Sequence, residues 1–245
     1  WMGEILFRTK LSENLFEGLS PWMQKLPGGL IHVNVVGCAL FAAISGSSAA
    51  TVATVGKMSI PELRKRNYPE KILLGSLAGS GTLGLLIPPS IILIIYGVTV
   101  QESIAKLFIA GIFPGIMIAI LFMLYVIVWS LLNKKSMPKS FEKYSFLEKI
   151  RRSKQLLPVI ILILAVIGSI YTGIATATEA ASLGVVGALI LSYFQKSLTL
   201  ENFKKSLLGA TKTSCMIAFI LAGSSFLSLA MGFTGLPRNL AIWIE

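Results

Sequence analysis

Four small polar residues, Ser45-Gly46-Ser47-Ser48, interrupt an apolar segment that spans residues 28–55. Hydroxyl groups in apolar surroundings are costly unless they find a partner. Gly46 allows a sharp turn, and a serine hydroxyl can cap the helix that follows it. The exposed carbonyls of such a turn can bind a cation, while the helix N-terminus faces an anionic substrate. The alternative is a face of small residues at which helices pack closely.

A second stretch, residues 79–90, reads Gly-Ser-Gly-Thr-Leu-Gly-Leu-Leu-Ile-Pro-Pro-Ser. Proline removes a backbone donor and clashes with the preceding turn, which costs about 3 kcal/mol inside a helix. The pair Pro88-Pro89 therefore predicts a discontinuous helix and frees the carbonyls of residues 84–87. In hydrocarbon these carbonyls need a bound cation or the polar wall of a cavity. A purely structural kink is the alternative.

A third stretch, Thr176-Ala177-Thr178-Glu179, places a carboxylate beside two hydroxyls. Thr176 or Thr178 can cap a helix that begins near Glu179, and an acidic residue in a first helical turn suits the helix dipole. Capping is one interpretation of these residues. The other is a role in gating or ion coupling.

The elements that position these residues are apolar helices. Of 245 residues, 54% are hydrophobic and 13% are charged, and the mean hydropathy is +0.78. A soluble domain carries about 25% charged residues, and a helix needs about 20 apolar residues to cross a bilayer. Four runs approach or exceed that length: residues 109–132, 156–170, 180–194 and 207–232. The composition therefore predicts an all-α integral membrane protein that spans the lipid bilayer several times.

The net charge of +11 comes from basic residues that cluster in the short loops between apolar runs. That placement follows the positive-inside rule and argues against a nucleic-acid partner, which would need a basic stripe on a folded face. Basic residues flank residues 28–55 on both sides, which predicts a re-entrant helical hairpin over residues 28–58. A broken helix over residues 72–98 then leads outward, and the basic loop 133–154 is cytoplasmic.

Other chemistry is not indicated. Cys38 and Cys215 both lie in apolar segments, where we expect small core residues rather than a disulfide. His32 has no Cys, Asp or Glu neighbour at metal-ligand spacing. The glycines of residues 79–84 lack the lysine of a phosphate loop, and no nucleophile elbow occurs. We therefore expect neither an enzyme nor an organic cofactor.

Taken in order, these motifs resemble the large membrane subunit of tripartite ATP-independent periplasmic (TRAP) transporters, the DctM-like family. The resemblance runs through residues 41–51, 81–90, 107–115 and 176–181 and covers nearly the whole chain. Two positions depart from the family pattern. Ala177 stands where the family usually has proline, and Asn67 replaces the usual glycine before Tyr68.

The resemblance implies sodium-coupled import of a small carboxylate across the bacterial inner membrane. A DctP-like periplasmic binding protein would deliver the substrate, and a DctQ-like small membrane subunit would complete the permease. The implied coupling ion is Na⁺, held at Ser45, Ser48, Thr82 and Gly84. The wider candidate set for sodium and substrate adds these residues: Gly46, Ser47, Ile87, Pro88 and Pro89. The implied architecture is an elevator-type transporter with inverted repeats.

The expected organisation has four parts. Residues 1–27 end a scaffold helix and form a cytoplasmic connection, and residues 28–110 form the first half of the transport domain. Residues 111–175 return to the scaffold, and residues 176–245 begin the second inverted repeat, cut before its hairpin. Such a fragment would lack half of the site and should not transport alone.

A channel or a non-transporting membrane scaffold is the alternative function. A channel needs a continuous polar stripe along its pore. Here the polar residues are confined to breaks within apolar segments, which favours a transporter.

Overall fold

The computed structural model describes residues 1–8, 11–138, 144–154, 156–235, 239 and 242–243. Throughout these ranges the chain forms helices, turns and loops, and no strand occurs. The first half contains α1 (Met2–Phe7), α2 (Leu11–Met23), α3 (Ile31–Ser45), α4 (Ser48–Lys65), α5 (Glu70–Gly81), the short 3₁₀ helix η1 (Thr82–Leu85) and α6 (Ile91–Val100). The second half contains α7 (Ile104–Leu132), the 3₁₀ turn η2 (Lys134–Ser136), α8 (Phe146–Ser153), α9 (Leu157–Tyr171), α10 (Ala177–Phe194) and α11 (Leu200–Thr234).

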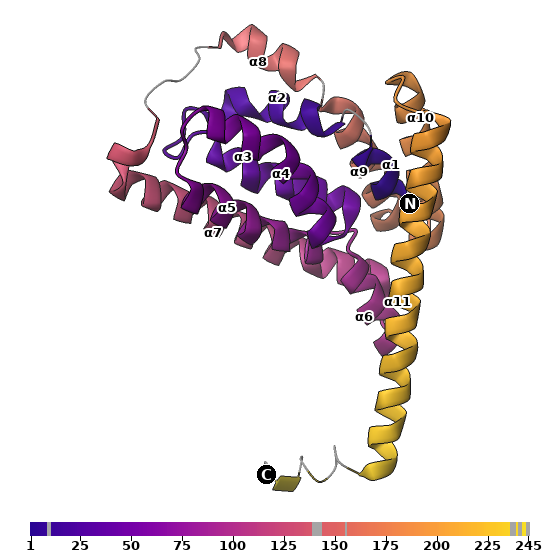
Figure 1. The fold of residues 1–245 in the computed structure, drawn as a ribbon. Coiled ribbons are helices and arrows are strands. Elements are labelled where there is room, and N and C mark those ends of the chain that lie inside the picture. The colour runs from indigo at the N-terminus through magenta and orange to yellow at the C-terminus, as the bar shows by residue number, and fades with distance from the viewer. Residues whose placement is uncertain (9–10, 139–143, 155, 236–238, 240–241, 244–245) are drawn as a thin grey trace.

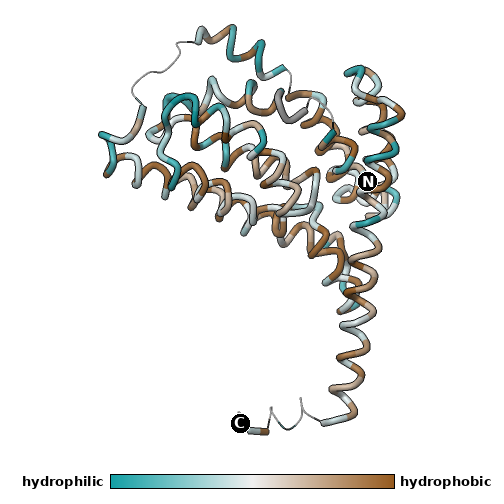
Figure 2. Tube along the Cα trace, in the orientation of Figure 1, coloured by the Kyte–Doolittle hydropathy of each residue, from teal (hydrophilic) through white to brown (hydrophobic). Residues whose placement is uncertain are grey.

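The predicted apolar runs are confirmed as helices. In the described ranges, α7, α10 and α11 are each long and apolar enough to cross a membrane, and α8 with α9 would make a fourth span if that bent pair acts as one. Figure 2 shows mostly hydrophobic residues along α7. Many of them are exposed, as Phe113 and Leu132 are, because their surroundings in a bilayer are lipid. The chain is an all-α membrane protein.

The helical hairpin and the discontinuous helix are also confirmed. Helices α3 and α4 pack against each other and join at Gly46, and both pack against α5 (Figure 1). The buried face of α3 includes Val35, Cys38 and Phe41, none of which is exposed. The second arm is longer than expected, since α4 continues past residue 58 to Lys65. The hairpin's re-entrant course through a bilayer stays a prediction.

The sequence predicted a basic loop over residues 133–154, but part of this segment is helical. It contains η2 and the amphipathic helix α8, while residues 139–143 lie outside the described part. Ser145 and Glu148 form a capping box at the start of α8. Helix α8 lies against α2, where Trp22 donates its indole N–H to the Ser153 hydroxyl at 2.8 Å. A helix of about two turns is too short for the helical spacing of its apolar residues to be recognised within a basic stretch.

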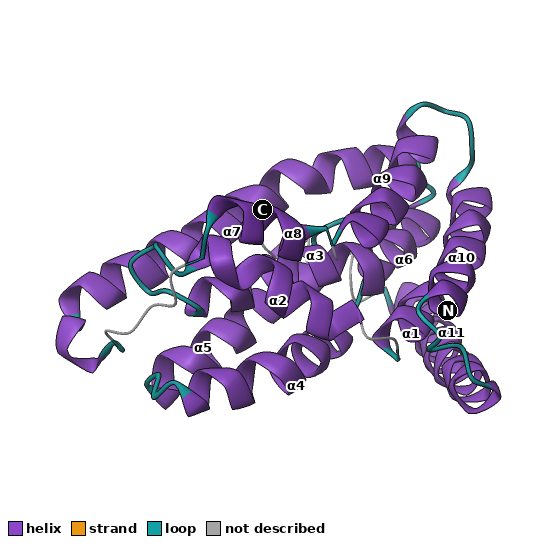
Figure 3. Cartoon of the chain, turned by 90° about the horizontal axis from the view of Figure 1, so that it is seen from above, coloured by secondary structure: helices purple, strands orange, loops and turns teal. Residues whose placement is uncertain are grey.

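Helices α10 and α11 lie at one end of the molecule, and α11 extends well beyond the other helices (Figure 1 and Figure 3). No residue is buried in the apolar window of α11 that qualifies as a span. The expectation that Cys215 is a core residue is therefore wrong: Cys215 is exposed, whereas Cys38 is buried, and both are free thiols. An apolar residue of a membrane helix can face lipid or another subunit instead of its own core.

Candidate functional site

The hairpin tip is a tight turn between two helix ends. Helix α3 ends at Ser45, and Gly46 follows with φ +59°, donating its N–H to the Ala42 carbonyl at 2.9 Å. This is the left-handed backbone that glycine adopts without strain. Ser47 is the N-cap of α4, and its hydroxyl accepts from the Ala50 N–H at 3.5 Å. The predicted turn and the predicted serine cap both occur here.

A hydroxyl relay crosses the tip. The Thr51 hydroxyl donates to the Ser47 carbonyl at 2.7 Å and lies 2.9 Å from the Ser45 hydroxyl. Because a hydroxyl carries one proton, a Thr51 hydroxyl that donates to Ser47 can only accept from Ser45, and the Ser45 hydroxyl donates either to Thr51 at 2.9 Å or to the Ser47 carbonyl at 3.2 Å. The Ser45 oxygen then accepts the Ser47 N–H at 3.3 Å. The relay fixes the orientation of the tip and leaves the Ser45 oxygen one lone pair.

The Ser48 hydroxyl differs from its neighbours. Its oxygen is buried and has no hydrogen-bond partner among the described residues. A buried hydroxyl without a partner loses its hydration and gains nothing in return, so native structures rarely keep one. The Ser48 oxygen is therefore free to serve a ligand.

The break in the helix occupies residues 82–90. The 3₁₀ turn η1 replaces the last α-helical turn, and the Pro88–Pro89 peptide bond is cis. One carbonyl freed by the break already has a protein partner, because the Ser90 hydroxyl donates to the Leu85 carbonyl at 2.6 Å. The exposed Thr82 donates its hydroxyl to the Gly79 carbonyl at 2.7 Å. The sequence predicted that a bound cation or the polar wall of a cavity would satisfy the freed carbonyls; for the Leu85 carbonyl the partner is a hydroxyl of the chain itself.

The hairpin tip and the break touch through their backbones. The Ile91 N–H donates to the Gly46 carbonyl at 3.2 Å. A Cβ atom on Gly84 would lie 2.8 Å from the Ser47 carbonyl carbon and 2.9 Å from the Ser48 nitrogen. A Cβ atom on Gly46 would lie 2.7 Å from the Pro89 carbonyl oxygen. Two motifs far apart in sequence thus meet with no side chain between them.

Helix α7 supports the break from another side. A Cβ atom on Gly111 would lie 2.8 Å from the Leu86 carbonyl oxygen and 3.6 Å from the Pro88 ring. A Cβ atom on Gly115 would lie 2.9 Å from the Ile87 side chain. Ile87 and Pro88 therefore pack against α7, whereas Gly84 and Pro89 face the hairpin. Among the predicted site residues, Ile87 and Pro88 therefore support the break, whereas Gly84 and Pro89 contact the hairpin tip.

The donor set at this junction consists of oxygens. Hydroxyls of Ser45 and Ser48 lie at the tip, and Gly84 brings its backbone against Ser47 and Ser48. Hard cations take oxygen ligands, and unwound backbone supplies them in transporters. In the described ranges no group of three His, Cys, Asp or Glu side chains could hold a metal ion. Oxygen donors of this kind suit a hard cation better than a transition metal.

The third predicted stretch lies elsewhere, at the start of α10, which packs against α9 and α1. Thr176 is the N-cap, and its hydroxyl accepts from the Glu179 N–H at 3.3 Å. The Glu179 carboxylate accepts from the Thr176 N–H and hydroxyl, each at 2.8 Å. These contacts form a capping box. Thr178 is exposed beside it. The capping interpretation describes the contacts observed, and gating stays a prediction.

Replacing Thr176 by alanine should separate these two interpretations. Loss of a threonine cap destabilises a protein by about 1 kcal/mol, so the melting temperature of the purified permease should fall by a few degrees. If capping is the whole role, the rate of transport at 25 °C stays near the wild-type value. A loss of transport without a change in melting temperature would instead favour gating.

Three contributors to the junction did not stand out from sequence. Thr51 and Ser90 lie within the quoted motifs, and only the fold shows that their hydroxyls satisfy the tip and the break. Gly3 of α1 packs against the tip, since a Cβ atom there would lie 3.0 Å from the Ser45 Cα. Thr51 and Ser90 could have been noticed in the sequence because each carries a hydroxyl near the end of a predicted break. Gly3 carried no signal in one sequence.

Together these features define a class: an all-α membrane protein in which the tip of a helical hairpin meets a break in a neighbouring helix. The family model for the tripartite ATP-independent periplasmic transporter, DctM component, matches residues 1–245. The chain belongs to this family.

Curated relatives agree with this membership. The chain is 34% identical over 243 residues to the C4-dicarboxylate TRAP transporter large permease protein DctM of Pseudomonas aeruginosa, covering 99% of this chain and 56% of the relative. It is 34% identical over 245 residues to the ectoine/5-hydroxyectoine TRAP transporter large permease protein UehC of Ruegeria pomeroyi, covering 97% and 55%. The isethionate TRAP transporter permease protein DctMQ of Oleidesulfovibrio alaskensis is 33% identical over 233 residues, with 94% and 36% covered. The chain spans little more than half the length of the first two.

Proposed function

We propose that this chain forms part of the large permease subunit of a sodium-coupled TRAP transporter that imports a small carboxylate. The contact between the hairpin tip and the helix break carries this proposal. Gly46 accepts from Ile91, and Gly84 lies against Ser47 and Ser48. A junction of two breaks is the arrangement in which transporters build ion and substrate sites near the bilayer midplane.

The proposed assembly includes a small membrane subunit and a periplasmic binding protein. The DctMQ name of the Oleidesulfovibrio alaskensis relative supports a partner of the first kind. The proposed location is the inner membrane, with the basic segments 57–71 and 133–154 in the cytoplasm by the positive-inside rule. An elevator motion would carry residues 28–110 past the scaffold.

The ligands at the junction would be Na⁺ and an organic anion. Ser45, Ser48, Thr82 and Gly84 would share the cation, and Gly46 and Ser47 would offer the start of α4 to the anion. The named substrates of the relatives differ, from C4-dicarboxylate to isethionate and ectoine. The proposal that the substrate is a carboxylate therefore rests on two things: the N-terminus of α4, which favours an anion, and the relatives that are named for C4-dicarboxylate.

A channel or a scaffold subunit is the competing function. A channel would present polar groups along a continuous path. In the described chain the paired breaks instead converge on one contact, and a scaffold has no need of a buried hydroxyl left free for a ligand, as at Ser48. These two observations favour the transporter.

Uptake of labelled acids by proteoliposomes tests the proposal. The vesicles contain the full-length permease with its small subunit, and the binding protein is added outside. The panel consists of a C4-dicarboxylate, a sialic acid, a keto acid and a sugar acid. Uptake of one acid should require both an inward sodium gradient and the binding protein. Uptake that does not depend on sodium would refute the cation role of the junction. If none of the four acids is taken up, the proposal that the substrate is a carboxylate is refuted.

A further inference from the structure

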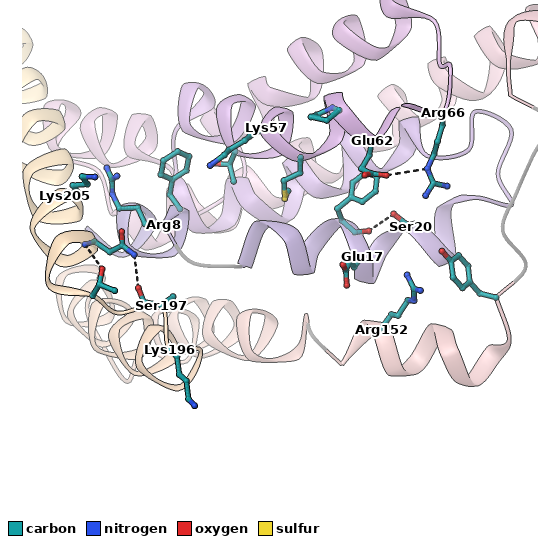
Figure 4. Close-up of a pocket in the computed structure, with 18 residues that line it drawn as sticks. Arg8, Glu17, Ser20, Lys57, Glu62, Arg66, Arg152, Lys196, Ser197 and Lys205 are labelled. Carbon is teal, nitrogen blue, oxygen red and sulfur yellow. Dashed lines mark hydrogen bonds and ion pairs between the residues drawn. The ribbon is translucent and has the colours of Figure 1, made fainter. Parts of the chain in front are cut away.

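A basic cleft lies away from the junction. It is a cleft of about 920 Å³ between α1, α2, α4, α8 and the segment that joins α10 to α11. Figure 4 shows side chains from these elements surrounding it. Its basic lining residues are Arg8, Lys57, Arg66, Arg152, Lys196 and Lys205. Among the described residues, two carboxylates, Glu17 and Glu62, line it as well.

Several of the cations have partners. Arg66 lies 3.7 Å from the Glu62 carboxylate, and Arg152 stacks on Tyr144 with 4.6 Å between the guanidinium and the ring centre. Lys57 is different: it is exposed into the cleft and makes no ion pair or hydrogen bond with any described residue. The cleft therefore carries an excess of positive charge, and Lys57, like the exposed Lys196, makes no contact with a described carboxylate that would keep it from a ligand.

The cleft shares a face of α4 with the hairpin tip. Thr54, Met58 and Pro61 line it at helical spacing, and the Thr54 hydroxyl donates to the Ala50 carbonyl one turn nearer the tip at 2.7 Å. A rise of about 1.5 Å per residue places Lys57 about 14 Å along the helix from Ser48. The lining of the cleft ends at Thr54, about 9 Å along the helix from Ser48 at the same rise per residue, so the helix face that forms one wall of the cleft points toward the tip.

We propose that this cleft is the exit vestibule through which a small organic anion leaves the hairpin tip for the cytoplasm. The proposal rests on the function proposed above and adds a route to it. A cleft lined by one sign of charge concentrates ions of the other sign and raises their association rates. Lys57 attracts the anion as it leaves the tip, and the other basic side chains of the lining guide it outward.

An anionic lipid headgroup is an alternative occupant of the cleft, because its phosphate or carboxylate group carries the same negative charge as a small organic anion. The cleft favours a small solute, because its apolar lining residues (Phe7, Phe16, Met58 and Pro61) are interspersed with charged and polar ones, among them Glu17, Ser197, Thr199 and Asn202. Acyl chains need a continuous apolar wall instead. The experiment therefore includes vesicles with and without anionic lipid.

Exchange across the proteoliposomes described above tests the vestibule. Unlabelled acid of the transported kind is loaded inside at increasing concentration, labelled acid is outside, and external binding protein selects correctly oriented permease. Lys57→Glu should raise the internal concentration for half-maximal exchange about fivefold and leave the external value unchanged. The effect should vanish in high internal salt, which screens charge. Lys57→Arg should behave as wild type, and so should Lys71→Glu, which reverses an exposed charge outside the cleft.

A second measurement needs no transport. Met58→Cys in the cleft and Leu74→Cys on exposed α5 are labelled with anionic and cationic thiol reagents in a background without native cysteines. The anionic reagent should be favoured several-fold more at position 58 than at position 74, and acids of the panel should slow its reaction there. Lys57→Glu should remove the preference.

Equal reagent preference at both positions would overturn the vestibule. So would an unchanged internal half-saturation in Lys57→Glu. Protection by phosphatidylglycerol vesicles but not by the acids, relative to phosphatidylcholine vesicles, would assign the cleft to lipid and also overturn it. Exchange and thiol labelling need no sodium gradient. Uptake that does not depend on sodium would therefore refute the coupling of transport to sodium, but it would leave the exit vestibule to be tested separately.

Discussion

Replacing Gly84 by alanine is expected to reduce sodium-driven uptake at least tenfold. The new Cβ atom would lie 2.8 Å from the Ser47 carbonyl carbon and 2.9 Å from the Ser48 nitrogen. Both are backbone atoms of the hairpin tip, so neither can rotate away, and overpacking of this kind destabilises by about 1–3 kcal/mol. The tip must move from the break, which separates the oxygens that are proposed to share the cation. Uptake by proteoliposomes and the melting temperature measure the two effects.

Gly75→Ala is the matched control. Gly75 lies in α5, one or two turns before the break, and a Cβ atom there meets nothing within 4 Å. Alanine also suits a helix better than glycine does. This variant should keep wild-type uptake and equal or higher stability. Full uptake by Gly84→Ala would contradict the importance of the contact, and a similar loss in Gly75→Ala would point to a general sensitivity of α5.

Replacing Ser48 by alanine is expected to raise the sodium concentration for half-maximal uptake about tenfold. The Ser48 oxygen is buried and has no partner among the described residues, so its removal breaks no hydrogen bond of the described chain. Stability without sodium should therefore change little or rise slightly. The stabilisation that sodium adds should shrink, because a bound ligand at free concentration c stabilises by RT ln(1 + c/Kd), which falls as Kd rises. Melting curves with increasing sodium chloride, against choline chloride at equal ionic strength, measure this difference.

Ser47→Ala gives the opposite pattern and serves as the control. Its hydroxyl caps α4 through the Ala50 N–H, so alanine should destabilise by about 1 kcal/mol. The sodium dependence of uptake should stay near wild type. Unchanged sodium affinity in Ser48→Ala would remove this hydroxyl from the proposed cation site. Equal effects of both variants on sodium affinity would mean that the shape of the tip, not one oxygen, determines binding.

Much of the fold followed from sequence because membrane helices obey strong local rules. Apolar length identified α7, α10 and α11, since a backbone in lipid must satisfy its own hydrogen bonds. Pro88 and Pro89 located the break, because proline cannot donate to a helix. Gly46 located the hairpin turn, and its φ of +59° gives the reason.

Other features could not be read from one sequence. Helix α8 is short, and its capping box lies in a basic stretch that resembles a loop. The exposure of Cys215 depends on where α11 runs, since an apolar residue fits a core and a lipid face equally well. The basic cleft gathers side chains from five separate parts of the chain, so no local pattern could indicate it.

The sequence by itself determined the membrane class, the two breaks and the family motifs, because composition, proline and glycine act locally. Only the tertiary structure decided that the breaks meet, through the Ile91 N–H and the Gly46 carbonyl. The same packing left the Ser48 hydroxyl without a partner in the described part of the chain and turned Ile87 toward α7. Such contacts depend on how distant helices approach each other, and their closeness is set by small residues on both sides.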